Sequence, residues 1–249
     1  MLRGLLVPAL LAACLAAGMG APGAAQSNPL SRLVGDRAEE REALWYLRDD
    51  GRGRFIFDRT VRPALIWEEG AREVIAVTAS PASGGGEVWR TDTGRTLMRV
   101  SRLGGATYFP DDARDGVIVE PVGRAQTLVP PPITGDELRR AAERMVDELA
   151  AMRRGGGAVT VEIAAPARGR AHSASHNAYI ADAMAMVVRG ADAAPRGAIR
   201  NLEEVYIGIG EAPAARFDGR MLDITLALED GYGGRPSSTH IRRTLEGGR

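Results

Sequence analysis

The sequence predicts an α+β protein with an N-terminal antiparallel β meander, either a sandwich or barrel-like, joined to a smaller α+β module. Short apolar runs separated by turn residues fill the first half, three consecutive prolines follow, and helix-period and strand-period segments alternate afterwards. We therefore expect five segments: a signal peptide (1–25), a β-rich module (26–125), a proline-rich linker (126–133), an α+β module (134–230) and a flexible tail (231–249).

The first 25 residues have the pattern of an export signal. Arg3 provides the positive start, residues 5–17 form an apolar run, and Gly23 and Ala25 stand at the −3 and −1 positions of a small-residue end. The apolar run of 13 residues is shorter than the roughly 20 needed to span a bilayer. We therefore expect cleavage after Ala25, a periplasmic or secreted location, and no transmembrane segment.

Cys14 provides an alternative, because Leu11-Ala12-Ala13-Cys14 resembles a bacterial lipoprotein box. In that case the cysteine is lipidated, and the protein is a membrane-anchored lipoprotein. The apolar residues that follow Cys14 favour simple cleavage, since a lipoprotein usually continues with a polar tether. After such cleavage no cysteine remains for a disulfide, so stability must come from an ordinary core.

The composition excludes several kinds of chemistry. The 32 basic residues balance the 32 acidic ones, which gives no reason to expect nucleic acid as a partner. All the basic residues are arginine, so neither a Schiff-base lysine nor a phosphate-loop lysine is available. We expect no cofactor.

The β-rich module begins with an acidic, partly apolar segment, 31–46, which predicts a short helix. Turn residues at 49–53 end it. The runs that follow are rich in Ile, Val, Phe and Trp, and several alternate apolar with polar residues. They predict an antiparallel sheet with one solvent-exposed face. The expected strands are 54–58, 64–68, 73–78, 87–91, 96–102 and 106–109, with a seventh strand at 116–122.

The α+β module begins with the clearest element in the sequence. Thr134 and Glu137 form a capping box ahead of apolar residues at helical spacing, and three glycines at 155–157 end the helix. Beyond them we expect a strand at 158–164, a helix at 173–189 and an antiparallel hairpin of strands 204–210 and 221–229. The tail is predicted to be loose, with at most a turn of helix at 239–245.

The segment AHSASHNAY, residues 171–179, contains the candidate catalytic residues. His172 and His176 are four residues apart, so on a helix they share a face and could bind a metal together, while Ser175 could be activated as a nucleophile. Asp182 is the candidate acid. The competing interpretation is that Ser173 or Ser175 caps the helix and the histidines lie in its exposed first turn.

Two further groups of residues each allow two interpretations. The aromatic residues are mostly in the first module, where they predict a core, with a ligand groove as the alternative. Arginines at 52, 54, 59 and 62 flank Phe55 and Phe57, which is compatible with an anion-binding edge but is more typical of a solvated sheet face.

Two short segments, GRFIFDRT (53–60) and SRLGGATYFP (101–110), carry a family resemblance. Downstream of a signal peptide, they resemble an uncharacterised family of secreted alphaproteobacterial proteins of unknown function. The resemblance implies a periplasmic or secreted setting and transfers no catalytic residue.

We therefore expect an exported cell-envelope protein that is not an enzyme and that binds an unidentified protein or small molecule of the envelope. The alternative is a periplasmic hydrolase or metal-dependent enzyme centred on His172 and His176. It ranks second because the sequence contains no complete catalytic motif.

Overall fold

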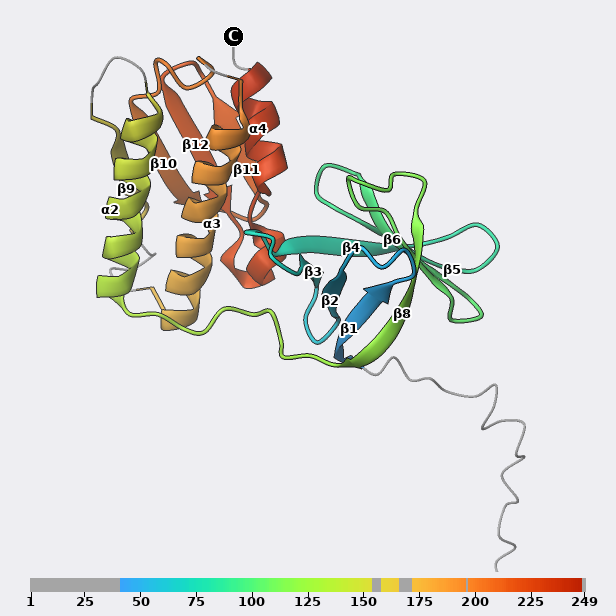
Figure 1. The fold of residues 1–249 in the computed structure, drawn as a ribbon. Helices are drawn as coiled ribbons and strands as arrows, with labels where there is room; N and C mark the ends of the chain where they lie inside the picture. Colours follow the sequence, from blue (N-terminus) through green and yellow to red (C-terminus); the bar gives the residue numbers. More distant parts are fainter. Residues whose placement is uncertain (1–40, 154–157, 166–171, 196, 248–249) are drawn as a thin grey trace, which may run out of the picture. The chain divides into compact units, whose positions relative to one another are not determined.

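A computed structural model describes residues 41–153, 158–165, 172–195 and 197–247 of the chain. Residues from Arg41 onward form one compact unit, built from a β barrel and a second module of helices and strands (Figure 1). The predicted signal peptide and Cys14 lie outside the described residues. None of the helices in the described part combines the length and apolar character that crossing a bilayer requires.

The first module is a closed barrel of eight strands in which each strand pairs antiparallel with the next, and the last pairs with the first. The predicted meander is therefore confirmed in its barrel-like form. The strands are β1 (Ala43–Arg48), β2 (Arg54–Asp58), β3 (Ala64–Glu68), β4 (Ile75–Pro81), β5 (Gly86–Arg90), β6 (Thr96–Ser101), β7 (Ala106–Tyr108) and β8 (Val117–Arg124).

Aromatic side chains fill the barrel interior. Phe55 and Phe57 alternate along β2 and are each 1% exposed. The ring of Tyr108 stacks on Phe55 at 4.2 Å between centroids, and Tyr46 stacks on the same residue at 5.4 Å. In a barrel of this size inward side chains can fill the interior, and here they form a continuous apolar core.

The prediction of a helix over 31–46 is wrong where the structure describes it, because Ala43–Arg48 is strand β1. This strand closes the barrel by pairing with both β2 and β8. Nothing within the segment reveals the pairing with β8, and the acidic residues around it imitate the polar face of a helix.

The connector between the modules is fixed by the barrel. Asp58, at the end of β2, is fully buried and accepts hydrogen bonds from the Thr127 hydroxyl and the Leu128 backbone N–H, both 2.7 Å.

The predicted capping box is confirmed at the start of α2 (Gly135–Met152), where the Thr134 hydroxyl accepts from the Glu137 N–H and the Glu137 carboxylate accepts from the Thr134 N–H.

The second module contains a four-stranded sheet in the order β11, β12, β10, β9. Its strands are β9 (Thr160–Ile163), β10 (Glu204–Ile209), β11 (Ala214–Phe217) and β12 (Met221–Leu226). The predicted hairpin of the segments 204–210 and 221–229 is wrong, because β10 and β12 run parallel. The loop between them contains β11, which pairs antiparallel with β12 and reverses the chain once more.

Helices α2 and α3 (Ala174–Ala193) pack together, and α3 also packs against α4 (Ser238–Gly247). Ile180, Met184 and Val187 of α3 are buried in the core of this module. The predicted cap is confirmed at Ser173, whose hydroxyl accepts from the His176 N–H.

The tail differs from the prediction. Residues Leu228–Gly234 form η2, which consists of two short 3-10 turns separated by a kink at Gly231. Helix α4 has ten residues rather than a single turn. Ile241 and Leu245, one helical turn apart on α4, are completely buried. Gly190 on α3 permits this packing, since a Cβ there would lie 2.8 Å from the Ile241 side chain.

Candidate anion-binding pocket

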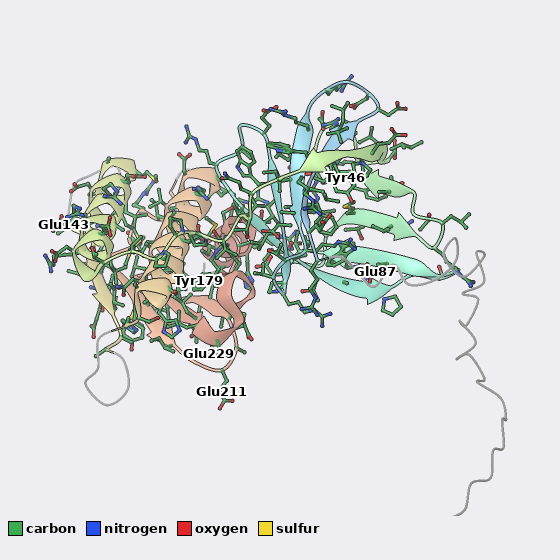
Figure 2. All side chains as sticks on the ribbon, turned by 90° about the horizontal axis from the view of Figure 1, so that it is seen from below. Tyr46, Glu87, Glu143, Tyr179, Glu211 and Glu229 are labelled. Atoms are coloured by element: carbon green, nitrogen blue, oxygen red, sulfur yellow. The ribbon has the colours of Figure 1, made fainter. Side chains whose placement is uncertain are left out.

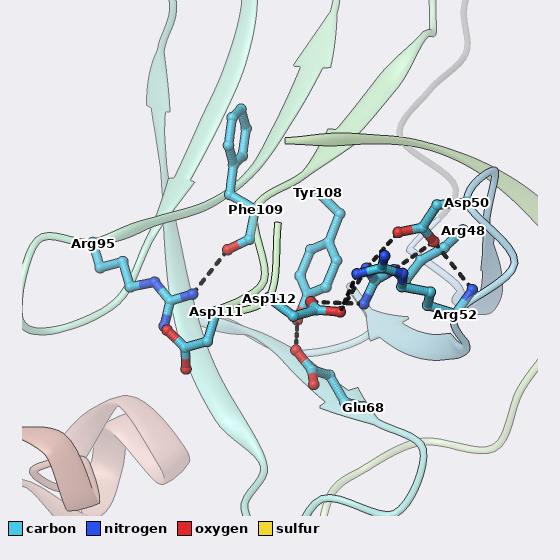
Figure 3. Close-up of polar contacts among 9 residues, drawn as sticks. All are labelled: Arg48, Asp50, Arg52, Glu68, Arg95, Tyr108, Phe109, Asp111 and Asp112. Atoms are coloured by element: carbon cyan, nitrogen blue, oxygen red, sulfur yellow. Dashed lines mark hydrogen bonds and ion pairs between the residues drawn. The ribbon is translucent and has the colours of Figure 1, made fainter. Parts of the chain in front are cut away.

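A cluster of charged and polar side chains lies at one end of the barrel (Figure 3). Tyr108, at the end of β7, is fully buried, and its hydroxyl donates to the carboxylate of Glu68 at the end of β3. Burial, reinforced by the Glu68 charge, raises the pKa of the Tyr108 hydroxyl far above its usual value of 10.0. Tyr108 therefore stays a hydrogen-bond donor at neutral pH.

Arg48, at the end of β1, joins the turns beside this pair. Its guanidinium group is 8% exposed and donates to both oxygens of Asp112, each at 3.0 Å, and to both oxygens of Asp50, at 3.0 and 2.6 Å. These hydrogen bonds hold the pKa values of both carboxyl groups below their usual range. Arg48 is therefore fully paired and serves to fix the two turns together.

Arg95 precedes β6 at the same end of the barrel. Its guanidinium group forms an ion pair with Asp111 at 2.8 Å and donates to the Phe109 carbonyl at 2.9 Å, as Figure 3 shows. The side chain is 38% exposed, so it can still reach a ligand.

Arg95 lines a pocket of about 510 Å³ between the barrel turns and α4. We call it the basic pocket. Its volume lies within the roughly 300–1,000 Å³ that is usual for ligand sites. The lining residues are Arg95, Thr96, Phe109, Asp111 and Arg114 from the barrel, and Thr239, Arg242 and Arg243 from α4.

The lining has more positive than negative charge. Asp111 is the one carboxylate among the lining residues, against four arginines, and it pairs with Arg95. Glu246, one turn along α4, lies 3.8 Å from Arg242. Within the described residues no carboxylate forms an ion pair with Arg114 or Arg243, both of which are exposed. Such a pocket attracts anions.

Barrel carboxylates hold α4 in this position. Asp92 accepts hydrogen bonds from the Ser237 N–H and hydroxyl, both 2.8 Å, and its carboxylate lies 3.4 Å from the ring of His240. Glu73 accepts from the Ser238 N–H at 3.3 Å and from the Ser238 hydroxyl. Acidic groups at a helix N-terminus compensate its free N–H groups and its dipole, so these contacts anchor the helix that supplies Arg242 and Arg243.

The residues predicted as catalytic lie in the second module, near the carboxyl ends of the parallel strands. The Nε2 atom of His172 is 3.1 Å from the Ala164 carbonyl, just after β9, and the Nε2 atom of His176 is 3.9 Å from Glu229, which follows β12. Glu229 projects at this edge of the module, as does Glu211 after β10 (Figure 2).

These predicted residues are not joined to one another. Ser175 is exposed in the first turn of α3, and Asp182 forms an ion pair with Arg235. Among the residues that the structure describes, no hydrogen bond or ion pair links the His172 ring with His176, Ser175 or Asp182. That part of the chain also contains no group of three or more His, Cys, Asp or Glu side chains able to hold a metal.

Sequence reasoning missed the arginines of the basic pocket. It considered those beside Phe55 and Phe57, where Arg54 instead pairs with Glu69 at 2.6 Å and covers the Trp45 ring at 4.4 Å. The C-terminal segment did contain a sequence signal for the helix that carries two of these arginines. Ile241 and Leu245 have helical spacing, which places Arg242 and Arg243 on a helix, although nothing local connects that helix with Arg95.

The fold and the pocket define a two-module α+β protein, with a closed antiparallel barrel followed by a mainly parallel sheet covered by helices. The chain belongs to the family described as domain of unknown function DUF4908, whose model matches residues 29–245. No curated protein and no solved structure matches the chain.

Proposed function

We propose that this protein is an exported, non-catalytic binding protein of the cell envelope, and that it binds an anionic ligand in the basic pocket. The observation that carries the proposal is the charge of the pocket lining, where Arg114 and Arg243 face the cavity without a carboxylate partner in the described part of the chain. Guanidinium groups stay protonated at any physiological pH and match the shape of carboxylates and phosphates.

The chemistry of the lining favours binding over catalysis. Arginine holds its proton too tightly to act as a general base, and the two hydroxyl groups, those of Thr96 and Thr239, have no histidine beside them in the lining. Phe109 adds an apolar surface for the uncharged part of a ligand. These groups suit recognition of a charged molecule and exclusion of a neutral one.

Calorimetric titration with acetate, sulfate and phosphate at low ionic strength tests the proposal. We expect at least one of these anions to bind, and we expect the double variant Arg114→Gln/Arg243→Gln to lose that binding. The double variant Arg102→Gln/Arg144→Gln, which removes two exposed charges outside the pocket, is the matched control and should bind as the wild type does. Absence of binding for all three anions, or equal binding by the two double variants, would contradict the proposal.

The cell-envelope location rests on the N-terminal sequence. The intact mass of protein purified from its natural host tests it. A chain that begins at Gln26 supports export with cleavage. A chain that begins at an acylated Cys14 makes the protein a lipoprotein, and one that keeps residues 1–25 overturns export.

A second candidate function is a hydrolase or metal-dependent enzyme at His172 and His176. It is favoured by their position, because open α/β sheets bind ligands at the carboxyl ends of their parallel strands, and His176 faces Glu229 there at 3.9 Å. Titration with zinc, comparing His176→Ala with His240→Ala as the control, tests it. Stoichiometric zinc binding that only His176→Ala removes would support this candidate.

A further inference from the structure

The two walls of the basic pocket carry equal excess charge. On the barrel wall, Arg95 is paired with Asp111 at 2.8 Å, whereas Arg114 has no carboxylate partner among the described residues. On the α4 wall, Arg242 lies 3.8 Å from Glu246, whereas Arg243 has no such partner in that same part of the chain. Each wall therefore contributes one paired and one unpaired guanidinium group.

We propose that the basic pocket takes a phosphoryl group in its doubly charged form, bound between Arg114 of the barrel and Arg243 of α4. This inference rests on the anion binding proposed above and adds the class of the ligand. A phosphate monoester carries about −1.5 to −2 charges at pH 7, which matches two unpaired guanidinium groups. A carboxylate, with a single charge, leaves one of them without a counter-charge.

The remaining lining groups suit the same ligand. Thr96 and Thr239 supply one hydroxyl donor from each wall, and a phosphoryl group has three strong acceptor oxygens. Phe109 offers an apolar surface beside the arginines, and Arg99 lies over its ring at 5.6 Å. An ester with an organic group can therefore contact Phe109 while its phosphoryl group lies between the walls.

A ligand bound between the two walls also affects how firmly α4 is held. Since the two unpaired arginines come from different modules, a ligand that contacts both strengthens the association of α4 with the barrel, in addition to the contacts of Asp92 and Glu73 with Ser237 and Ser238. Binding energy then appears as increased stability of the folded chain.

Calorimetric titration at pH 8 with inorganic phosphate, phenyl phosphate and acetate tests the inference. We expect both phosphate compounds to bind at least about tenfold more tightly than acetate, since a hydrogen bond to a charged group adds roughly this factor. Arg114→Gln and Arg243→Gln should each weaken phosphate binding about tenfold, with little effect on the affinity for acetate. Arg102→Gln and Arg144→Gln, exposed arginines outside the pocket, are the single-site controls, and circular dichroism verifies folding of every variant.

The outcomes separate this inference from the proposed function. Phosphate and acetate binding with equal affinity overturns the doubly charged ligand, while anion binding in the pocket stands. A loss of phosphate binding in only one of the two variants shows that the ligand does not bridge the walls, and it also overturns the inference. If none of the anions binds, both proposals fail.

Discussion

Arg235, which precedes α4, forms an ion pair with Asp182 of α3, and the two side chains are only 2% and 19% exposed. The same guanidinium group donates to the Val74 carbonyl of the barrel at 2.9 Å and lies over the ring of Tyr232 at 5.0 Å. Arg235 thus connects α3, η2 and the barrel, and Asp182 is its counter-charge.

Removing that counter-charge should destabilise the protein. Asp182→Ala leaves a buried guanidinium group unpaired, so we expect the free energy of unfolding to fall by about 3 kcal/mol. Asp192→Ala, an exposed carboxylate on the same helix, should change it by no more than about 0.5 kcal/mol. Urea denaturation of both variants measures the difference, and equal midpoints would contradict the structural role of Asp182.

Alkaline pH should destabilise the fold through its buried tyrosines. Burial raises the pKa values of Tyr46, Tyr108 and Tyr232 above 10.0. In the unfolded chain these phenols ionise near pH 10 while the folded state keeps them neutral, so stability is fully present below pH 10 and is lost as the pH rises toward the folded-state values. The chain contains no lysine, so lysine titration does not obscure the effect.

Tyr108→Phe tests this directly. Above about pH 10, the free energy of unfolding of this variant should fall less steeply with pH than that of the wild type. Denaturation at several pH values should show a difference in slope of up to about 1.4 kcal/mol per pH unit. The variant should also lose about 1 kcal/mol at pH 7, because the hydrogen bond to Glu68 disappears. An unchanged alkaline slope would show that Tyr108 ionises as readily in the folded protein as in the unfolded chain.

Asp58 should make the connector sensitive to acid. Burial by itself would raise its pKa, but hydrogen bonds from Thr60, Leu128 and Thr127 hold the pKa below its usual 3.8. The contribution of ionised Asp58 to the stability of the fold is therefore present above about pH 4. It is lost as the pH falls through the folded-state pKa of this carboxyl group.

Asp58→Asn should lower the free energy of unfolding by about 2 kcal/mol at pH 7, and this difference from the wild type should shrink as the pH falls below about 4. Asp115→Asn, in an exposed turn, is the control. Denaturation of both variants and the wild type over this pH range tests the prediction. A stability difference between Asp58→Asn and the wild type that stays constant with pH would argue against an ionised Asp58.

Gly190 should be required for the position of α4. Its Cβ in Gly190→Ala would lie 2.8 Å from Ile241 and 2.9 Å from the Ser238 carbonyl. We expect a loss of about 1–2 kcal/mol from this overpacking, despite the better helix propensity of alanine. Gly135→Ala, where a Cβ meets open space, is the matched control, and thermal denaturation that ranks the two variants equally would contradict the close contact.

Elements with local signals could be predicted from the sequence. The strands from β2 to β8 follow alternation and turn residues, and the start of α2 follows from Thr134 and Glu137 alone. The closure of the barrel by β1 and the parallel pairing of β10 with β12 depend on partners far along the chain, which no local pattern encodes. The basic pocket was missed for the same reason, since Arg114 and Arg243 are brought together by the docking of α4.

The anchoring of α4 joins Asp92 to Ser237, which are 145 residues apart in the chain. The barrel supplies only one wall of the basic pocket, and the other wall comes from α4. Capture of the ligand would therefore distinguish molecules in which α4 is docked from those in which this helix has been lost or displaced.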